Sequence, residues 1–414
     1  MKHLRKFDSV SEMNTALASA TIDILALAYD GQGNPVLKTK QVPDPSIPFY
    51  IDVRGSVTLA ATSGLQMSTD KTNWTDTTAT TLSSGKTYFR VASDQSSPLK
   101  PNWTEDSNSD YDIGGNINSL VKVNFENDTN CYEFSSEWEG FFQDKSKLKS
   151  AGNLILPATT LTDRCYQLMF YGCTALTTAP ALPATTLADN CYDSMFYGCT
   201  ALTTAPALPA TTLADNCYDS MFIGCTSLTT APALPATTLA NGCYVRMFIG
   251  CTSLTTAPAL PATTLANGCY QFMFRSCSSL TTAPALPVTT LARECYSGMF
   301  ASCTSLTTAP ALPATTLSDY CYQDMFYGCT ALTTAPALPA TTLADGCYGA
   351  MFSNCTNLND IECLATDISA SECTDSWVDG VAATGTFVKN PSMSSWTTGN
   401  SGIPSGWTVQ DATA

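Results

Sequence analysis

The chain has 414 residues, of which 13% are charged, and its formal net charge is −16. An ordinary soluble domain has about twice that share of charged residues. Only five of the 19 basic residues lie after position 150, so the clustered Lys and Arg that neutralise nucleic-acid phosphates are missing and we exclude a nucleic-acid partner. The single histidine, His3, lies at the N-terminus, which excludes Ser-His-Asp and Cys-His catalysis and His-ligated zinc.

Residues 1–42 are predicted to form a small α+β unit. Ser9 and Glu12 have the spacing of a helix-capping box, which predicts a helix that begins there. A strand over 23–29 and a partner strand over 36–41 are predicted to follow, joined by a Gly-rich turn.

The N-terminal sequence does not have the pattern of a signal peptide, because no apolar run of about 7–15 residues follows its basic start. No run of about 18 apolar residues predicts a membrane span. We therefore expect the chain to be made, and to fold, in a reducing cytoplasm.

Residues 43–112 are predicted to form an Ig-like β-sandwich. Short runs alternate apolar and polar residues, and Gly, Asp and Asn separate them at intervals of about ten residues. The runs lie at 49–51, 57–59, 65–67 and 88–91.

A 26-residue repeat dominates the chain from about residue 156 to 358. One unit, starting at Leu182, reads LPATTLADNCYDSMFYGCTALTTAPA. Its first cysteine recurs at 165, 191, 217, 243, 269, 295, 321 and 347, and its second at 173, 199, 225, 251, 277, 303, 329 and 355. A fixed period of this length predicts a solenoid, because one unit cannot bury its own apolar face but a stack of units can.

Each unit has two halves. The half from Leu176 to Leu182 suits a short extended segment, and its prolines exclude a long hydrogen-bonded strand. The other half, residues 187–199, spaces apolar residues at i, i+4 and i+8, which predicts a short helix. The predicted fold class is therefore an α/β solenoid of leucine-rich-repeat coils, each a short strand plus a short helix, preceded by the small α+β unit and the β-sandwich. The solenoid with imperfect repeats as caps is placed at 113–388, and a C-terminal tail or cap at 389–414.

The repeated cysteines are predicted to form two buried ladders of small apolar residues. Zinc sites use closely spaced cysteine pairs, which this sequence lacks, and disulfides could form only between neighbouring coils. Whether any cysteines pair is left open. No catalytic constellation and no phosphate-binding loop emerges, so we expect a protein that is not an enzyme and that needs no metal or cofactor.

Paired threonines, such as Thr177-Thr178 and Thr185-Thr186, recur along the repeats and would align as ladders. A flat threonine array can bind ice. Because adjacent threonines are expected to point to opposite faces, we favour a solvated hydroxyl surface.

Variation between otherwise identical units concentrates next to the two cysteines. Neutral drift at exposed positions explains it most simply, and a contact surface tuned from coil to coil is the functional alternative. On that alternative, aromatic, aliphatic and Arg side chains are the candidate anchors. The ligand-contact candidates are Tyr197, Ile223, Arg246, Ile249, Phe272, Arg275 and Tyr327.

The unit C-Y-x-x-M-F-x-G-C-T-x-L-T-x-A-P-x-L-P-A-T-T-L resembles the BspA-like leucine-rich repeats common in gut and oral Bacteroidales, over roughly 131–388. The tail from Gly385 to Trp407 resembles the C-terminal end that such proteins often carry. This resemblance implies an extracellular binding role, namely adhesion to host matrix, glycans or other cells.

The N-terminal segment Lys6–Met13, followed by Pro48-Phe49-Tyr50, resembles the start of virion or tail-associated proteins of phages that infect gut Bacteroidales. That resemblance implies a non-enzymatic fibre or accessory protein of a virion, made in the host cytoplasm. Residues 1–42 would attach to a virion protein, and the solenoid would bind a bacterial surface protein or a glycan, including mucus, without membrane insertion. Homo-oligomerisation, as a trimer for example, is left open. The alternative is a BspA-like adhesin on the surface of the bacterium itself.

Overall fold

The computed structural model describes residues 43–131, 140–394 and 396–413, together with the backbone of three N-terminal strands. These strands are β1 (Leu4–Lys6), β2 (Ile24–Tyr29) and β3 (Pro35–Thr39), and they pair antiparallel in the order β1-β3-β2. β2 and β3 confirm the two strands predicted in this segment. The helix predicted to begin at Ser9 lies outside the described residues.

Two sheets precede the coils, and their inner faces share one core. The six-stranded sheet has the order β12 (Leu148–Ile155), β11 (Tyr111–Asn116), β4 (Tyr50–Val53), β9 (Gly85–Val91), β6 (Leu65–Ser68) and β7 (Thr75–Asp76). The three-stranded sheet has the order β10 (Trp103–Glu105), β5 (Val57–Leu59) and β8 (Thr80–Leu82), and a 3-10 helix, η1 (Ile117–Leu120), follows β11. Trp103 of the smaller sheet packs edge-on against Tyr111 of the larger one, with ring centroids 5.9 Å apart. β4, β5, β6 and β9 lie where the alternating apolar runs predict strands.

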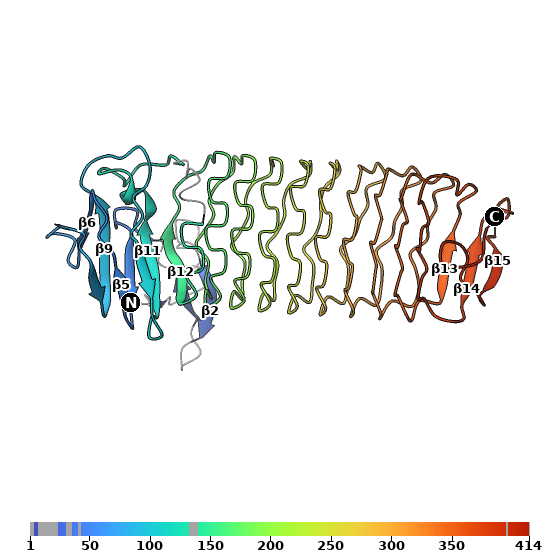
Figure 1. Ribbon diagram of the computed structural model, residues 1–414, viewed down its shortest axis with the longest axis horizontal. Coiled ribbons are helices and arrows are strands. Elements are labelled where there is room, and N and C mark those ends of the chain that lie inside the picture. Colours follow the sequence, from blue (N-terminus) through green and yellow to red (C-terminus); the bar gives the residue numbers. More distant parts are fainter. Residues whose placement is uncertain are drawn as a thin grey trace.

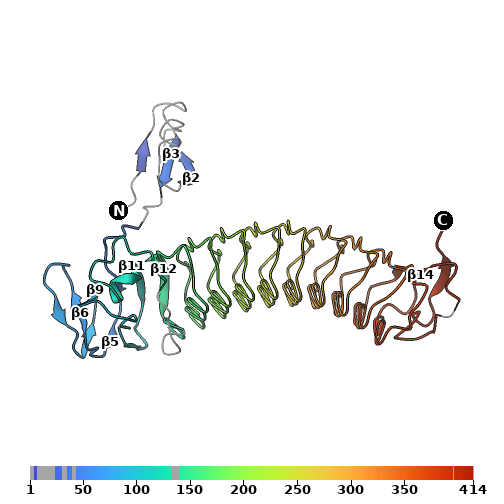
Figure 2. The same ribbon diagram turned by 90° about the horizontal axis from the view of Figure 1, so that it is seen from above.

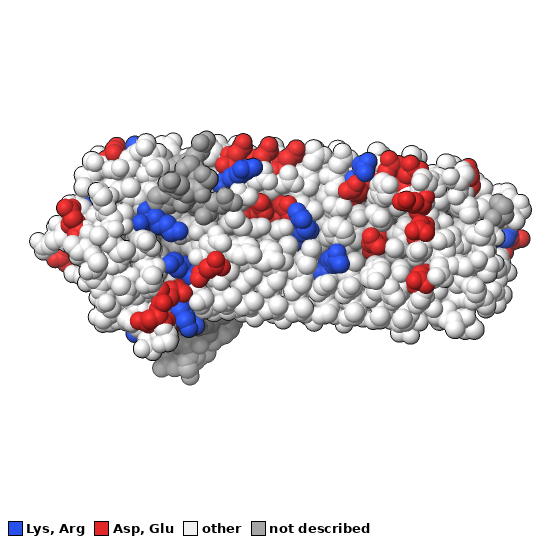
Figure 3. All heavy atoms as spheres, viewed as in Figure 1, with Lys and Arg blue, Asp and Glu red and all other residues white. Residues whose placement is uncertain are grey.

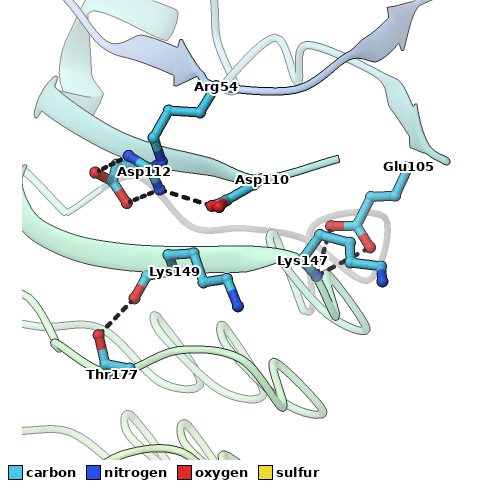
Figure 4. A network of polar contacts seen from close by, with 7 residues as sticks. All are labelled: Arg54, Glu105, Asp110, Asp112, Lys147, Lys149 and Thr177. Carbon is cyan, nitrogen blue, oxygen red and sulfur yellow. Dashed lines mark hydrogen bonds and ion pairs between the residues drawn. The ribbon is translucent and has the colours of Figure 1, made fainter. Parts of the chain in front are cut away.

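The larger sheet continues into the coils. β11 pairs antiparallel with β4 on one side and parallel with β12 on the other. Polar contacts accompany this junction (Figure 4): Arg54 forms ion pairs with Asp110 at 2.8 Å and Asp112 at 2.7 Å, and the Thr177 hydroxyl donates to the carbonyl oxygen of Lys149 at 2.9 Å. Hydrogen bonding therefore runs without a break from the sheets into the first coil.

The repeats form coils that lie side by side in a gently curved row (Figures 1 and 2). Parallel β-bridges join threonines one repeat apart, such as Thr186 with Thr212 and Thr204 with Thr230. Each bridge is isolated, because prolines such as Pro206 lack the N–H that would extend it. The prediction of a short extended segment is confirmed.

The half of each repeat predicted to be helical is instead a run of consecutive turns. The described residues contain no α-helix. In the unit that starts at Leu182, every fourth residue of the run is left-handed: Asn190 has a φ of 55°, Ser194 of 54° and Gly198 of 71°. A right-handed helix cannot include such residues. The helix prediction was wrong because a turn run with a period of four also buries positions i, i+4 and i+8, the spacing that indicated a helix.

Backbone N–H groups in the turn run bond alternately within a coil and between coils. The N–H of Cys191 donates to the carbonyl oxygen of Ala188, three residues earlier, at 3.3 Å. The next N–H, that of Tyr192, donates to the carbonyl oxygen of Cys217 in the following coil at 3.0 Å. Every second donor of a coil therefore depends on its neighbour, which ties the stability of each coil to the stack.

Two aromatic ladders fill the core of the row. The Phe222 ring lies between those of Phe196 and Phe248, with centroid distances of 5.6 Å to each and planes within 5°. The Tyr218 ring is stacked in the same way between Tyr192 and Tyr244. These rings are buried, so the near-identical sequence of the repeats is explained by identical packing in successive coils.

Imperfect repeats close both ends of the row. At the N-terminal end Phe142 stacks on Phe170 of the first regular coil at 5.3 Å, and at the C-terminal end Trp377 stacks on Tyr348 at 6.3 Å. Three parallel strands complete the C-terminal end, β13 (Asp360–Cys363), β14 (Thr386–Lys389) and β15 (Thr408–Asp411). The tail predicted at 389–414 therefore contributes a strand to this last sheet. No helix of the described residues is long and apolar enough to cross a membrane.

Candidate binding surface

The repeated cysteines are part of the core. Seventeen of the 19 are free and buried, as the prediction of two buried ladders requires. The thiol of each second cysteine donates to the carbonyl oxygen of a phenylalanine in the preceding coil at 3.0–3.2 Å, as Cys225 does to Phe196. Burial raises the pKa of Cys225 and of Cys355 to about 12, so these thiols stay protonated and remain donors. A disulfide joins the other two cysteines, Cys131 and Cys165.

The solvent side of the turn runs is the surface on which the coils differ. We call it the turn face; it comprises the outward-pointing residues of 163–172 in the first coil and their equivalents in later coils. Its geometry follows from the period of four, because two buried residues, such as Met195 and Phe196, alternate with two that reach solvent, such as Tyr197 and Gly198.

All seven predicted contact residues lie on the turn face, in two columns that run along the row. The first column contains Tyr197, Ile223, Ile249, Arg275 and Tyr327, and the second contains Arg246 and Phe272. Neighbouring coils bring Arg246, Ile249, Phe272 and Arg275 together. Tyr197 and Tyr327 lie two coils away from this group on either side, so the seven residues do not form one site. Arg246, Arg275 and Tyr327 are exposed, and the other four are partly buried.

A depression of about 490 Å³ crosses the turn face where Arg246 and Phe272 lie. Gly242 and Gly268 occupy equivalent positions in two neighbouring coils, and their lack of side chains leaves space for the depression. The coils on either side carry Asn216 and Glu294 at this position. Both glycines are left-handed, with φ of 56° and 59°. A Cβ atom on Gly242 would lie 2.2 Å from Oδ1 of Asn216, so the backbone approaches that side chain closely.

Charged groups at the two ends of the depression are held in pairs. Arg246 places Nη2 2.8 Å from Oδ2 of Asp219 and Nε 3.3 Å from Oδ1. This hydrogen bonding raises the pKa of Arg246 above its ordinary value. Arg293 donates from Nε to Glu294 at 2.9 Å, and Gln271 donates to the second oxygen of Glu294 at 3.1 Å. Both guanidinium groups are therefore oriented before any ligand binds.

The Phe272 ring packs over Gly298 of the next coil. A Cβ atom on Gly298 would lie 2.1 Å from the ring, and the Arg275 guanidinium carbon lies 5.5 Å from the ring centroid. Tyr320 covers Gly346 in the same way, with the corresponding Cβ distance at 2.3 Å. At these two places the residues of neighbouring coils are coupled, since an aromatic side chain in one coil is matched by glycine in the next.

Comparison with known protein families assigns the repeats. Residues 190–333 and 267–373 match the family model described as a BspA type leucine-rich repeat region, with six copies. Residues 190–373 are BspA-type leucine-rich repeats. The resemblance inferred from the sequence is confirmed over this range, which includes the whole depression. No curated protein and no solved structure matches the chain.

Sequence reasoning missed several residues of the depression in the BspA-type repeats. They are Asn216, Asp219, Asn241, Gly242, Val245, Asn267, Gly268, Gln271, Arg293 and Glu294. One signal was readable: two residues before the first cysteine most repeats carry Asp, and three successive repeats carry Asn241, Asn267 and Arg293 instead. The described residues contain no group of three His, Cys, Asp or Glu side chains placed to hold a metal ion.

The paired threonines of successive coils, such as Thr177-Thr178 and Thr203-Thr204, form a second surface, which we call the threonine surface and which is nearly the same from coil to coil. Thr203 and Thr204 are both solvent-exposed, as are Thr177 and Thr178 in the preceding coil. A second depression of about 560 Å³ lies there between neighbouring coils, lined by threonine, alanine, proline and leucine. The repeats thus present two different surfaces, one nearly invariant and one that changes along the row.

Proposed function

We propose that the protein is a non-enzymatic, adhesin-like binding protein whose turn face contacts the ligand. This proposal rests on where the repeats differ in sequence. The buried ladders are the same in coil after coil, while the residues of the turn face change and form a depression. BspA-type repeats over residues 190–373 support the same assignment. Burial raises the pKa of the thiols of Cys217 and Cys269 and keeps them protonated, which supports a function without thiol nucleophiles.

The turn face is favoured over the threonine surface because specific recognition needs a position that differs from its neighbours. The threonine surface offers the same groups in every coil, whereas the turn face offers Arg, Phe, Ile and Tyr at defined coils. Arg and aromatic side chains contribute most to binding energy in protein interfaces. The proposed ligands are a bacterial surface protein or a glycan, including mucus glycans.

The test is adhesion of the full chain to mucin-coated surfaces and to purified bacterial envelopes, measured by biolayer interferometry. A turn-face variant, Tyr197→Ser with Phe272→Ser and Tyr327→Ser, is compared with a threonine-surface variant, Thr177→Ser with Thr203→Ser and Thr229→Ser. We expect the first variant to lose at least about tenfold in affinity, as removal of anchor residues does, and the second to bind like the parent. Equal losses in both variants, or no adhesion by the parent chain, would overturn the proposal.

We further propose that the protein is carried on a phage virion as a fibre or accessory protein, attached through residues 1–42. Support for this part comes from the resemblance of Lys6–Met13 and Pro48–Tyr50 to virion or tail-associated proteins. Mass spectrometry of purified particles, beside vesicle and outer-membrane fractions, distinguishes this location from a bacterial surface adhesin. Stoichiometric copies in particles would support the virion location, and recovery only in envelope fractions would overturn it.

A further inference from the structure

A column of aspartates on the turn face links successive coils. These residues stand two positions before the first cysteine: Asp163, Asp189 and Asp215 near the start of the row, and Asp319 and Asp345 near its end. Oδ1 of each aspartate of the first group accepts the backbone N–H of the equivalent residue in the next coil, at 3.2, 3.1 and 2.9 Å along the row. Oδ1 of Asp345 accepts the N–H of Ser371 at 2.9 Å.

The column loses its negative charge in the coils of the depression, where Asn241, Asn267 and Arg293 occupy the position. Asn241 keeps the structural bond, because its Oδ1 accepts the N–H of Asn267 at 3.3 Å. An amide oxygen therefore suffices to link the coils, and the carboxylates elsewhere are not required by the fold. The change from Asp to Asn alters charge while it preserves the backbone contact.

The basic residues gather in the same place. Only three Lys or Arg residues occur between positions 165 and 388, and they are Arg246, Arg275 and Arg293, in three successive coils. Figure 3 shows acidic side chains on both sides of a middle stretch of the row where basic side chains lie. In a chain of net charge −16, this is the part of the turn face that repels an anion least.

Each of the two arginines in the depression has guanidinium N–H groups that its acidic partner does not occupy. Asp219 occupies Nε and Nη2 of Arg246, and Glu294 occupies Nε of Arg293. Nη1 of Arg246 and both terminal nitrogens of Arg293 are not part of these pairs, and each side chain is about half exposed, at 49% and 55%. A guanidinium group with donors directed to solvent suits the planar geometry of a carboxylate or sulfate.

We propose that this depression binds an acidic saccharide. A carboxylate or sulfate group of the sugar is bound by Arg246 or Arg293, a sugar ring packs against Phe272, and the amides of Asn216 and Gln271 bond its hydroxyls. The volume of about 490 Å³ is within the range of small-ligand sites. This inference rests on the proposed function and deepens it by naming the class of ligand.

The test measures binding of sialyllactose, sulfated lactose and neutral lactose to the full chain by saturation-transfer NMR and calorimetry. We expect one or both acidic sugars to bind at least about tenfold more tightly than lactose, with affinity that falls as salt is added. The carboxylate and sulfate arms identify which anionic group is preferred. Equal binding of all three sugars would overturn the proposal.

Two variants with matched controls locate the site. Asn267→Asp restores the carboxylate that the column carries elsewhere, and Asn354→Asp makes the same change on the turn face two coils beyond Arg293, outside the depression. We expect Asn267→Asp to weaken acidic-sugar binding about tenfold and Asn354→Asp to leave it nearly unchanged, since a charge beyond a Debye length is screened. Arg246→Gln and Arg293→Gln, made singly, identify the arginine that holds the anion. If neither arginine variant weakens binding, or if both added carboxylates act equally, the site is not this depression.

The experiments distinguish a failure of the acidic-saccharide inference from a failure of the proposed adhesin-like function. A chain that adheres to mucin or envelopes but binds no acidic sugar overturns this inference and leaves the proposed function standing. Competition of that adhesion by peptides and not by sugars would assign the turn face to a protein ligand and would also overturn the inference. A chain that adheres to nothing overturns the proposed function itself.

Discussion

Alkaline pH should unfold the coils, because the core contains many thiols that must stay protonated. Burial raises the pKa of seven of them to about 12, against an ordinary value of 9.0. A thiol with a raised folded-state pKa contributes stability that is complete below the unfolded-state pKa. That stability is lost as pH rises from about 9 towards the folded-state value of about 12.

The size of the effect follows from these values. At about pH 10 ionisation stabilises the unfolded chain by between about 1 and 2 kcal/mol per thiol, which amounts to roughly 10 kcal/mol for the seven together. A typical domain has a total stability of about 5–15 kcal/mol. The buried tyrosines of the core ladder, such as Tyr244, act in the same direction at higher pH, because burial raises their pKa as well. We therefore expect the coils to unfold between about pH 9 and pH 10.5.

The assay follows circular dichroism and the ultraviolet absorbance of thiolate in the same samples as pH is raised. Loss of structure and appearance of thiolate should coincide, while the chain in denaturant should ionise its thiols near the ordinary pKa. Repeating the titration at high salt separates this effect from repulsion within a chain of net charge −16, since salt screens repulsion and leaves the thiol contribution in place. Thiolate that appears near pH 9 in a fully folded chain would refute the reasoning, because the thiols would then be accessible to water.

Three sets of substitutions test other parts of the structure by urea unfolding. Phe248→Ala removes a ring stacked at 5.6 Å on both neighbours and should cost about 3–5 kcal/mol, whereas a cost below about 1 kcal/mol would contradict the ladder. Gly298→Ala should cost about 1 kcal/mol more than Gly268→Ala: both residues have φ of 59°, but only at Gly298 does the new Cβ meet the Phe272 ring, and Phe272→Ala should abolish the difference. Asp189→Ala should cost about 1 kcal/mol and Asp189→Asn close to nothing, because the amide keeps the 3.1 Å bond to the next coil; equal costs would show that charge matters more than the acceptor.

Periodicity made the repeat architecture predictable. The 26-residue period, the two cysteine positions and the alternating runs before the repeats correctly indicated the coils, the buried cysteine ladders and strands β4, β5, β6 and β9. The N-terminal cap was also predictable, because Phe141-Phe142 repeats the pattern of the unit imperfectly. In the structure Phe142 stacks on Phe170 of the first regular coil. These features depend on which residues are apolar, and composition along the chain reports that directly.

The turn run could not be distinguished from a helix by apolar spacing alone. Left-handed residues decide between them, and these include Ser194 and Arg246, whose residue types give little warning of a positive φ. The contact candidates Arg246 and Phe272 were found because they are bulky at exposed positions. Gly242 and Gly268 were missed because their part in the depression is to lack side chains, which becomes visible only when neighbouring coils are placed together.

Hydrogen–deuterium exchange of the full chain, with and without bound mucin, determines whether the turn face is the binding surface. Binding at the turn face should slow exchange in segments 241–246, 267–275 and 293–298, and should leave exchange unchanged around Thr177, Thr203 and Thr229 and in β4 to β9. Protection confined to the threonine segments or to the N-terminal sheets, with the turn face unchanged, would contradict it.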